Sequence, residues 1–310
     1  LTWLLHHWCI NAGVELVALT VDHRLQPNST ENARKVYEWL KSWDVDCQIL
    51  TWFGVKPNTR IQENARINRY KLMLDWCIQN KFEDLALAHH QEDQAETFMI
   101  RIYRGSGTDG LACMQAISKM RGVRLLRPFL AVPKSRLLAT LNLQNHEWLD
   151  DPANTNTFFT RTLVRELNNS LAERGLDTAR LAVLSGQFGC LRARLEGVTQ
   201  LAIDRAVNIY PTGWASVDGR FLMRMPDEVG RRVIIYLIKS IGGHHYPPRR
   251  KALDRLIHFI KLTDKSTAYS LGGCSIRRTN VNQLMIIREE HNPKRIIQIN
   301  SAGCLMWRGV

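Results

Sequence analysis

The alternation of short apolar runs with helical segments is the feature that most constrains the fold of this chain. Val14 to Asp22 (VELVALTVD), Asp46 to Thr51 and Leu85 to His89 are short strand-like runs, and the first is rich in valine. Apolar residues recur at helical spacing around them, over 1–13, 30–43, 61–80 and 91–103. Strands that are buried on both faces of a parallel sheet have this apolar character. The pattern predicts an α/β fold with a doubly wound, mostly parallel sheet.

The residues that follow the predicted strands are the first candidates for a functional site. Doubly wound sheets bind their ligands beyond the carboxyl ends of the strands. Asp22 and His23 follow the first strand, and His89 and His90 follow a later one. We therefore expect these side chains to border a common ligand site.

His89, Asp93 and Glu96 are separated by four and three residues, so on a helix they would share one face. Such a trio could orient an amine or act in acid-base chemistry. An exposed polar helix start, whose acidic residues favour the helix dipole, explains the same spacing about equally well. The spacing is a weak metal signal, because a third histidine or cysteine ligand is missing.

A glycine-containing segment, Arg104-Gly105-Ser106-Gly107, comes directly after the predicted helix. Glycines let the backbone approach a phosphate, and Arg104 could add a charge-assisted hydrogen bond. For the glycines alone, an ordinary turn is the simpler interpretation. Its position one helix after His89 and Asp93 predicts that the segment reaches the same crevice.

The C-terminal part carries most of the excess positive charge. The 310 residues include 42 Lys and Arg against 29 Asp and Glu, a net charge of +13. Residues 1–185 hold 22 basic and 20 acidic residues, whereas 186–310 hold 20 basic and 9 acidic ones. Basic residues bind polyanions by releasing counterions, so nucleic acid is the predicted partner. An ordinary solvated basic surface is the alternative.

Three basic clusters and two aromatic residues favour nucleic-acid binding over a merely solvated surface. They are Arg231-Arg232, Arg249-Arg250-Lys251 and Arg277-Arg278, with Trp214 and Tyr246 as residues that could stack on bases. Helices over about 188–206 and 227–241 and a hairpin of Tyr269–Ile276 with Asn282–Arg288 predict an α+β C-terminal domain.

The cysteines and the hydropathy pattern indicate a reducing, aqueous setting. The seven cysteines are odd in number and form no C-x-x-C pair, which argues against a disulfide framework or a zinc ribbon. No run approaches the roughly 20 apolar residues of a membrane span, and no cleavable signal precedes the first motif. We therefore expect a cytoplasmic protein with no membrane partner.

Seven short motifs occur in a fixed order along the chain. They are T-V-D-H at 20–23, A-R-x-x-R-Y at 65–70, H-H-x-x-D-Q-A-E-T at 89–97, R-G-S-G at 104–107, R-P at 127–128, D-P-x-N at 151–154 and R-x-x-x-R at 161–165. In this order they resemble the tRNA(Ile)-lysidine synthases of the N-type ATP pyrophosphatase, or PP-loop, superfamily. The resemblance covers about residues 1–185 directly, and the rest resembles the appended tRNA-binding domain of that family more loosely.

The resemblance implies three domains and a ligase reaction. The domains are a PP-loop catalytic domain over 1–135, its helical extension over 136–185 and a smaller basic α+β tRNA-binding domain over 186–310. In the implied reaction, ATP adenylates C2 of cytidine-34 in the CAU anticodon of tRNA(Ile) and pyrophosphate leaves. The ε-amine of L-lysine then displaces AMP. The product, lysidine, converts AUG reading to AUA and methionine identity to isoleucine identity.

The resemblance also implies roles for individual residues. The catalytic set is His89, Asp93 and Glu96; the ATP set is Asp22, His23, Arg104, Gly105, Ser106 and Gly107; the substrate and tRNA set is Asp151, Asn154, Arg161 and Arg165, to which the charge pattern adds Arg249, Arg250 and Lys251. ATP is the implied co-substrate, with Mg²⁺. The oligomeric state, including a homodimer, and the protein ligands of Mg²⁺ stay open.

One family motif does not occur in the sequence, the Ser-Gly-Gly-x-Asp-Ser loop that holds the ATP phosphates. Leu1 to Leu5 resembles the helix that follows this loop in the family. We therefore expect that the first strand and the loop are missing by truncation and that this polypeptide does not turn over ATP. Ser270 to Ser275 (SLGGCS) lacks the aspartate and is expected to be a turn.

Two other functions stay open at this point. One is a tRNA-thiolating PP-loop enzyme, although such enzymes generally use cysteine pairs. The other is a non-catalytic RNA-binding protein with a degenerate PP-loop domain.

Overall fold

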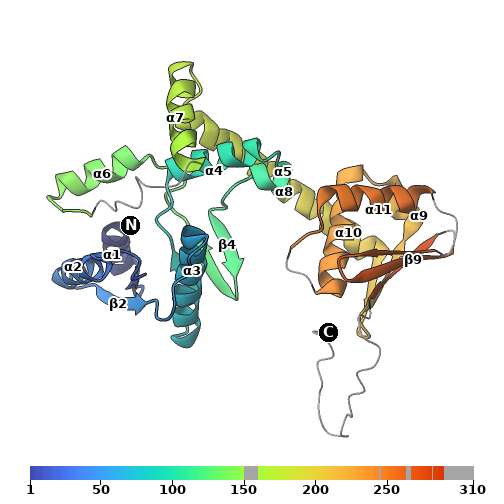
Figure 1. Ribbon diagram of the computed structural model, residues 1–310, viewed down its shortest axis with the longest axis horizontal. Coiled ribbons are helices and arrows are strands. Elements are labelled where there is room, and N and C mark those ends of the chain that lie inside the picture. The colour runs from blue at the N-terminus through green and yellow to red at the C-terminus, as the bar shows by residue number, and fades with distance from the viewer. Residues whose placement is uncertain (150–159, 244–245, 263–266, 281, 290–310) are drawn as a thin grey trace, which may run out of the picture. The chain divides into compact units, whose positions relative to one another are not determined.

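The computed structural model describes residues 1–149, 160–243, 246–262, 267–280 and 282–289 (Figure 1). The chain divides into two compact units, Leu1–Cys190 and Leu191–Val310, and each is described by itself. None of the helices in the described ranges is long and apolar enough to cross a membrane.

The first unit begins with the predicted alternation of helices and strands. Its elements are α1 (Thr2–Ala12), β1 (Val17–Asp22), α2 (Ser29–Ser42), β2 (Asp46–Thr51), α3 (Ile61–Gln79), β3 (Asp84–Ala86), α4 (Gln91–Tyr103), α5 (Thr108–Leu111), β4 (Ile117–Met120), β5 (Val123–Leu126), α6 (Lys134–Leu143), α7 (Thr160–Glu173) and α8 (Thr178–Ala206), which continues into the second unit. Gly13 ends α1 in the left-handed conformation, with φ 65°, which glycine adopts without strain.

The parallel strands are covered by helices on both faces. β1 pairs with β2 in parallel, and β3 pairs with β5 in parallel. Ala18 and Cys47 pack against α2, whereas Leu19, Val21 and Leu50 pack in the cluster that surrounds α3. Alternate residues of these strands therefore face opposite layers. The α/β class with a doubly wound, mostly parallel sheet is confirmed.

The parallel strands form two sheets, a difference from the single sheet that the sequence predicts. Within the described residues, β1 and β3 are not hydrogen-bonded to each other. Helix α3 joins the two sheets, because Tyr70, Met73 and Leu74 pack in one core with residues of β1, β3 and β5. The antiparallel pairing of β4 with β5 is also an addition to the predicted pattern. Strand β4 is largely exposed, so it lacks the apolar run that reveals a buried strand.

Helices α4, α7 and the first part of α8 pack together, above α3 and β4 in the view of Figure 1. Ala95 and Phe98 of α4 contribute to this core with Leu181 of α8. The boundary predicted near Ser185-Gly186 lies inside α8, and the prediction that a helix begins at about residue 188 is wrong. Glycines within a long helix lower its stability without ending it when neighbouring packing holds the turn.

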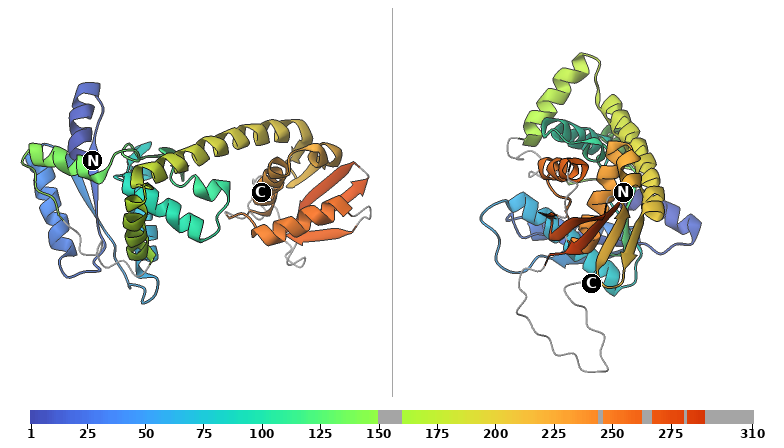
Figure 2. Two further views of the ribbon diagram at one scale, coloured as in Figure 1. Left: turned by 90° about the horizontal axis from the view of Figure 1, so that it is seen from above. Right: turned by 90° about the vertical axis from the view of Figure 1, so that its right-hand side faces the viewer.

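The second unit is an α+β structure, as predicted. Its elements after α8 are β6 (Val207–Tyr210), β7 (Trp214–Asp218), α9 (Gly219–Arg224), α10 (Asp227–Gly242), α11 (Arg250–Leu262), β8 (Ala268–Leu271), β9 (Cys274–Asn280) and β10 (Gln283–Arg288). All pairings in the sheet, whose order is β6-β7-β10-β9-β8, are antiparallel. Figure 2 shows its strands in yellow to red beside the helices of the same unit. One face of the sheet packs on α10 and α11, with Leu237, Leu256 and Ile286 fully buried between them.

The predicted strand Tyr269–Ile276 is two strands. Gly272 and Gly273, with φ 59° and 69°, form the turn between β8 and β9. Positive φ at two successive residues is the backbone of a tight hairpin turn. The expectation that Ser270–Ser275 contains a turn is confirmed, and β9 pairs with β10 in the predicted hairpin.

Candidate active site

Asp22 ends β1 and organises the turn that follows it. The carboxylate is 2% exposed and accepts hydrogen bonds from Ser29 Oγ (2.7 Å) and Thr30 Oγ1 (2.8 Å), at the start of α2. It also accepts from the backbone N–H of Arg24 (3.0 Å). Burial alone raises the pKa of this carboxyl, but these hydrogen bonds and the Arg24 charge together hold the pKa below its ordinary value. Asp22 is therefore an ionised carboxylate that holds the turn after β1 in place at the carboxyl edge of the sheet.

The turn after β2 lies beside Asp22. The backbone N–H of Trp52 donates to the Asp22 carbonyl oxygen (2.9 Å), and the Trp52 ring meets the His23 ring edge to face at 6.2 Å. Lys56 donates to the Trp52 carbonyl oxygen (2.6 Å), with its ammonium 3.9 Å from the indole centroid. Of the two predicted residues, His23 thus borders the edge with a partly exposed imidazole, while Asp22 supports the loop beneath it.

The H-H-x-x-D-Q-A-E-T motif lies at the end of β3 and the start of α4. His90 is the residue before α4, and the Asp93 carboxylate accepts a hydrogen bond from its backbone N–H (3.0 Å) in a capping box. His89 precedes the helix, so the expectation that it shares a helical face with Asp93 and Glu96 is wrong. The chain turns at His90 because the capping box starts the helix there.

Two further residues of this motif tie α4 to its neighbours. The Glu92 carboxylate accepts from the backbone N–H of Lys134 with both oxygens (3.1 and 3.0 Å), at the start of α6. The buried Gln94 amide donates to the Met114 carbonyl oxygen (2.8 Å) and accepts from the Met114 N–H (3.1 Å). Glu96 lies two residues further on and is 6% exposed. Glu92 and Gln94 of this motif therefore have a structural role.

His89 is the residue of the motif whose pKa its surroundings shift strongly. Burial lowers the pKa of His89 to about 4; Asp93 opposes this shift, and the charges of Arg66, Arg127 and Arg69 add to it. The imidazole is therefore neutral at pH 7. Its Nδ1 is buried without a hydrogen-bond partner in the structure. The structure thus brings His89 and Asp93 into one electrostatic neighbourhood with three arginines.

Those arginines are functional candidates to which sequence reasoning assigned no role. Arg66 and Arg69 lie in the first half of α3, which begins at the carboxyl edge after β2, and Arg127 follows β5. All three belong to the A-R-x-x-R-Y and R-P motifs. Their order in the chain was visible, but their convergence on His89 depends on the packing of α3 over β3 and β5.

The Arg104–Gly107 segment lies at the opposite end of α4 from His89. The helix between them has 13 residues, which corresponds to about 20 Å. Gly105 has φ 62°, and Gly107 is the residue before α5. The structure does not bring this segment together with His89 and Asp93 as predicted, because α4 runs straight between them.

The predicted substrate residues are only partly described. Asp151 and Asn154 lie outside the described residues, and Arg161 and Arg165 are in α7 but their side chains are not described. Arg249, Arg250 and Lys251 are exposed at the start of α11. Tyr246 is 86% exposed, whereas Trp214 is already stacked on Tyr210 at 3.9 Å.

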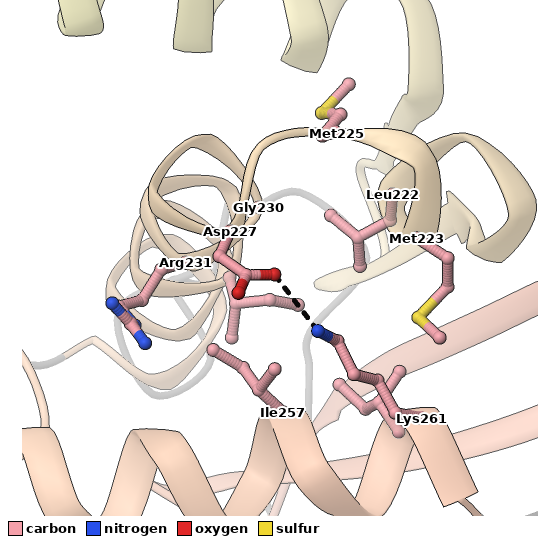
Figure 3. Close-up of a pocket in the computed structure, with 10 residues that line it drawn as sticks. Leu222, Met223, Met225, Asp227, Gly230, Arg231, Ile257 and Lys261 are labelled. Atoms are coloured by element: carbon pink, nitrogen blue, oxygen red, sulfur yellow. Dashed lines mark hydrogen bonds and ion pairs between the residues drawn. The ribbon is translucent and has the colours of Figure 1, made fainter.

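The cluster Arg231-Arg232 differs from the one at α11. Arg231 forms ion pairs with Glu228 and Asp254, and Arg232 pairs with Glu228. Nearby, a pocket between α9, α10 and α11 has an apolar lining that includes Leu222, and an ion pair between Asp227 and Lys261 (3.0 Å) lies at its rim (Figure 3). Arg231 lines this pocket, whereas none of the predicted catalytic or ATP-binding residues does.

The comparisons with known proteins agree with the fold and the motifs. A PP-loop domain model matches residues 1–171. The fold and this match define the class as PP-loop proteins. A U34-tRNA thiolase from Methanococcus maripaludis, solved with its [4Fe-4S] cluster, is similar in structure with a TM-score of 0.53 and 14% identity, over 61% of this chain and 65% of that one. This likeness shows the fold alone.

Curated relatives narrow the class. The tRNA(Ile)-lysidine synthase of Wolbachia pipientis wMel is 32% identical over 94% of this chain and 68% of its own length. Those of a Wolbachia from Brugia malayi (32%; 90% and 65%) and of Methylobacterium nodulans (35%; 79% and 73%) are similar too. The chain therefore belongs to the tRNA(Ile)-lysidine synthase family. It spans about two thirds of the length of the Wolbachia relatives.

Proposed function

We propose that this protein is an ATP-dependent ligase that attaches L-lysine to C2 of cytidine-34 in the CAU anticodon of tRNA(Ile), in a reducing cytoplasm. The observation that carries the proposal is the extent of the similarity to tRNA(Ile)-lysidine synthases. It covers up to 94% of the chain, so it includes the basic second unit as well as the PP-loop domain. Adenylation of C2 would precede attack by the lysine ε-amine, with pyrophosphate and AMP as products.

The charges around His89 support this chemistry. A lysine ammonium must be bound and deprotonated before its nitrogen can attack. The carboxylates proposed for that role are Asp93 and the buried Glu96, which follow His89 in the chain. A neutral His89 can accept a hydrogen bond at pH 7. Asp22 and His23 border the proposed adenosine site. Arg249, Arg250 and Lys251 are proposed to hold the tRNA backbone.

Mg²⁺ is proposed to arrive with ATP. Among the described residues, no group of three or more His, Cys, Asp or Glu side chains could hold a metal ion. Protein side chains in these ranges thus do not provide a cage, and phosphate oxygens are common Mg²⁺ ligands. We assign no step of the reaction to the ion.

Thiolation of tRNA is the nearest alternative function, and the cysteines disfavour it. The six cysteines of the described ranges are free thiols, and four of them are buried. Burial raises the pKa of Cys47 and Cys77, and it raises that of Cys274 to about 11. Such thiols are poor nucleophiles at neutral pH. A non-catalytic RNA-binding role is disfavoured by the charged cluster around His89, which simple RNA binding does not need.

The test measures lysine incorporation into a tRNA(Ile) transcript with a CAU anticodon. Because the sequence lacks Ser-Gly-Gly-x-Asp-Ser, the assay compares the chain as it is with a chain extended before Leu1 by a strand and a Ser-Gly-Gly-x-Asp-Ser loop. We expect ATP-dependent lysidine and stoichiometric AMP from the extended chain, and neither from the shorter one. Nucleoside mass spectrometry identifies the product.

Two controls make the outcome decisive. A transcript with uridine at position 34 should accept no lysine, and Glu96→Gln in the extended chain should lower incorporation while the tRNA still binds. Sulfur transfer in place of lysine transfer would indicate the thiolase alternative. Tight binding of tRNA by the extended chain without any ligation would indicate the binding protein.

A further inference from the structure

Arg127 is a buried cation whose partners carry no charge. The residue is 8% exposed and follows β5. Its Nη1 donates to the Gln115 carbonyl oxygen (2.8 Å) and to Ser118 Oγ (3.0 Å). Its Nε is buried and has no hydrogen-bond partner. One side of the guanidinium is therefore held by Gln115, just before β4, and by Ser118 of β4, while its Nε has no partner in the structure.

No carboxylate in the described part of the chain forms an ion pair with Arg127. Two neutral oxygens orient the guanidinium, but they do not neutralise it. A buried charge without a counter-charge is costly, and proteins normally pair it or use it to bind a ligand of opposite charge. Arg124, on the same strand, shows the contrast: it is exposed and pairs with Asp84 through two hydrogen bonds (2.7 and 2.5 Å).

The neighbours of Arg127 strengthen the case for an anion. Its charge acts on His89, which is neutral and carries a buried ring nitrogen without a partner. Arg66 and Arg69 act on the same imidazole from α3, and the Asp93 carboxylate acts on it with the opposite sign. The register places Leu126 beside Ala86, so Arg127 and the residues after β3 leave the sheet at the same carboxyl edge. Ligands of this fold class bind at that edge.

We propose that Arg127 and His89 form a binding site for a phosphate group at the carboxyl edge of β3 and β5. The guanidinium supplies charge and a fixed fork, and the neutral imidazole supplies a hydrogen bond. A phosphate offers more acceptor oxygens to donors around one point than the two oxygens of a carboxylate do. The phosphate belongs either to a nucleotide or to the tRNA backbone. Naming a nucleotide and tRNA as the two sources rests on the proposed function, whereas the anion site itself rests on the contacts of Arg127 and His89.

The experiment measures binding to the full chain by calorimetry. The probes are AMP, adenosine, an RNA stem-loop with the CAU anticodon, and free L-lysine. Arg127→Met should weaken AMP or the stem-loop by about tenfold or more, the loss typical of a strong charge-assisted contact, and leave adenosine unchanged. Loss for AMP alone identifies a nucleotide phosphate, and loss for the RNA alone identifies the backbone.

Two matched variants separate binding from folding. Arg124→Met removes an arginine from the same strand and should not change any of the affinities. Arg127→Lys keeps the charge but not the fork, so it should recover part of the lost affinity. Without ligand, Arg127→Met should melt at or above the temperature of the unchanged chain, because an uncompensated buried charge has been removed.

Three results would overturn the proposal. They are unchanged phosphate affinity in Arg127→Met, loss for L-lysine alone, and a lower melting temperature with no change in phosphate binding, which is what a purely structural role predicts. Failure of the proposed function looks different, because phosphate binding would still require Arg127 while the extended chain formed no lysidine.

Discussion

Asp22 illustrates how a residue of a functional motif can act by holding the backbone. Both of its oxygens are taken up by hydrogen bonds from Arg24, Ser29 and Thr30. The carboxylate therefore sets the path of the chain from β1 into α2, where His23 reaches the edge of the sheet. Glu92 and Gln94 act in the same way at the start of α4. Positioning and chemistry are divided among neighbouring residues of one motif.

Asp22→Asn should lower the free energy of unfolding by about 1–3 kcal/mol at pH 7, since buried hydrogen bonds to a charged acceptor are lost. The folded state holds the pKa of Asp22 below its ordinary value. Its contribution is therefore fully present above the unfolded pKa of about 4 and is lost as pH falls below it. Urea unfolding at several pH values measures the difference.

The control for this prediction is Asp46→Asn, at an exposed position at the start of β2. It should change stability little at any pH. A gap between Asp22→Asn and the unchanged chain that does not narrow as pH falls from neutral through the acidic range would contradict the assignment, because protonation of the carboxylate removes the contribution of its lowered pKa.

At the scale of elements, the end of α10 packs closely against the turn between β8 and β9. Helix α10 ends at Gly242, whose missing side chain lets the Gly272 carbonyl oxygen of the β8–β9 turn come close. Cys274, fully buried, lies beside the same contact. The turn between β8 and β9 can thus lie directly on the end of α10, which closes the core of Leu237, Ile238 and Ile276.

Gly242→Ala should destabilise the protein by about 1–3 kcal/mol or more, because an added Cβ would overlap the Gly272 carbonyl and force the backbone apart. Gly197→Ala is the matched control. It lies within α8 with open space around it and should stabilise the chain by about 0.5–1 kcal/mol through helix propensity. Thermal unfolding measures both, and equal effects of the two variants would contradict the close-packing argument.

At the scale of the whole molecule, the excess positive charge lies almost entirely in the C-terminal part of the chain. Residues 186–310 carry 20 basic and 9 acidic residues. Ion pairs with Glu228 and Asp254 use the charge of Arg231 and Arg232 within the unit. No such pair involves Arg249, Arg250 or Lys251 in the described ranges, and the positive end of the α11 dipole adds to their field.

Charge reversal at Arg249, Arg250 and Lys251 should weaken tRNA binding and lower the salt dependence of the affinity, with up to about 0.9 lost from the logarithmic slope per phosphate contact. Filter binding at several salt concentrations measures both quantities. Reversal at Lys41, Lys71 and Lys119, three exposed lysines of the first unit, changes the net charge equally and serves as the control. If both triple variants bind alike, the cluster is only a solvated surface.

The sequence by itself determined most of the elements and their order, although it placed a helix start inside α8 and merged β8 with β9. The apolar runs of β1 and β2 and the helical spacing of α3 and α4 are local patterns, and a local pattern is enough to specify a buried strand or an amphipathic helix. The same holds for the α/β class and the family, because motifs in a fixed order can be read along the chain. The short hairpin of β4 and β5 was not predicted, because β4 is mostly exposed and lacks such a pattern.

Only the tertiary structure decided which motif residues meet. It placed His89 outside α4, separated Arg104–Gly107 from it by the length of that helix, and brought Arg66, Arg69 and Arg127 to the same imidazole. These outcomes depend on where a helix cap forms and on how α3 packs across two sheets. The cap is a local hydrogen bond between residues three apart, whereas the packing of α3 is a long-range fact about burial, and spacing along the chain carries no information about it.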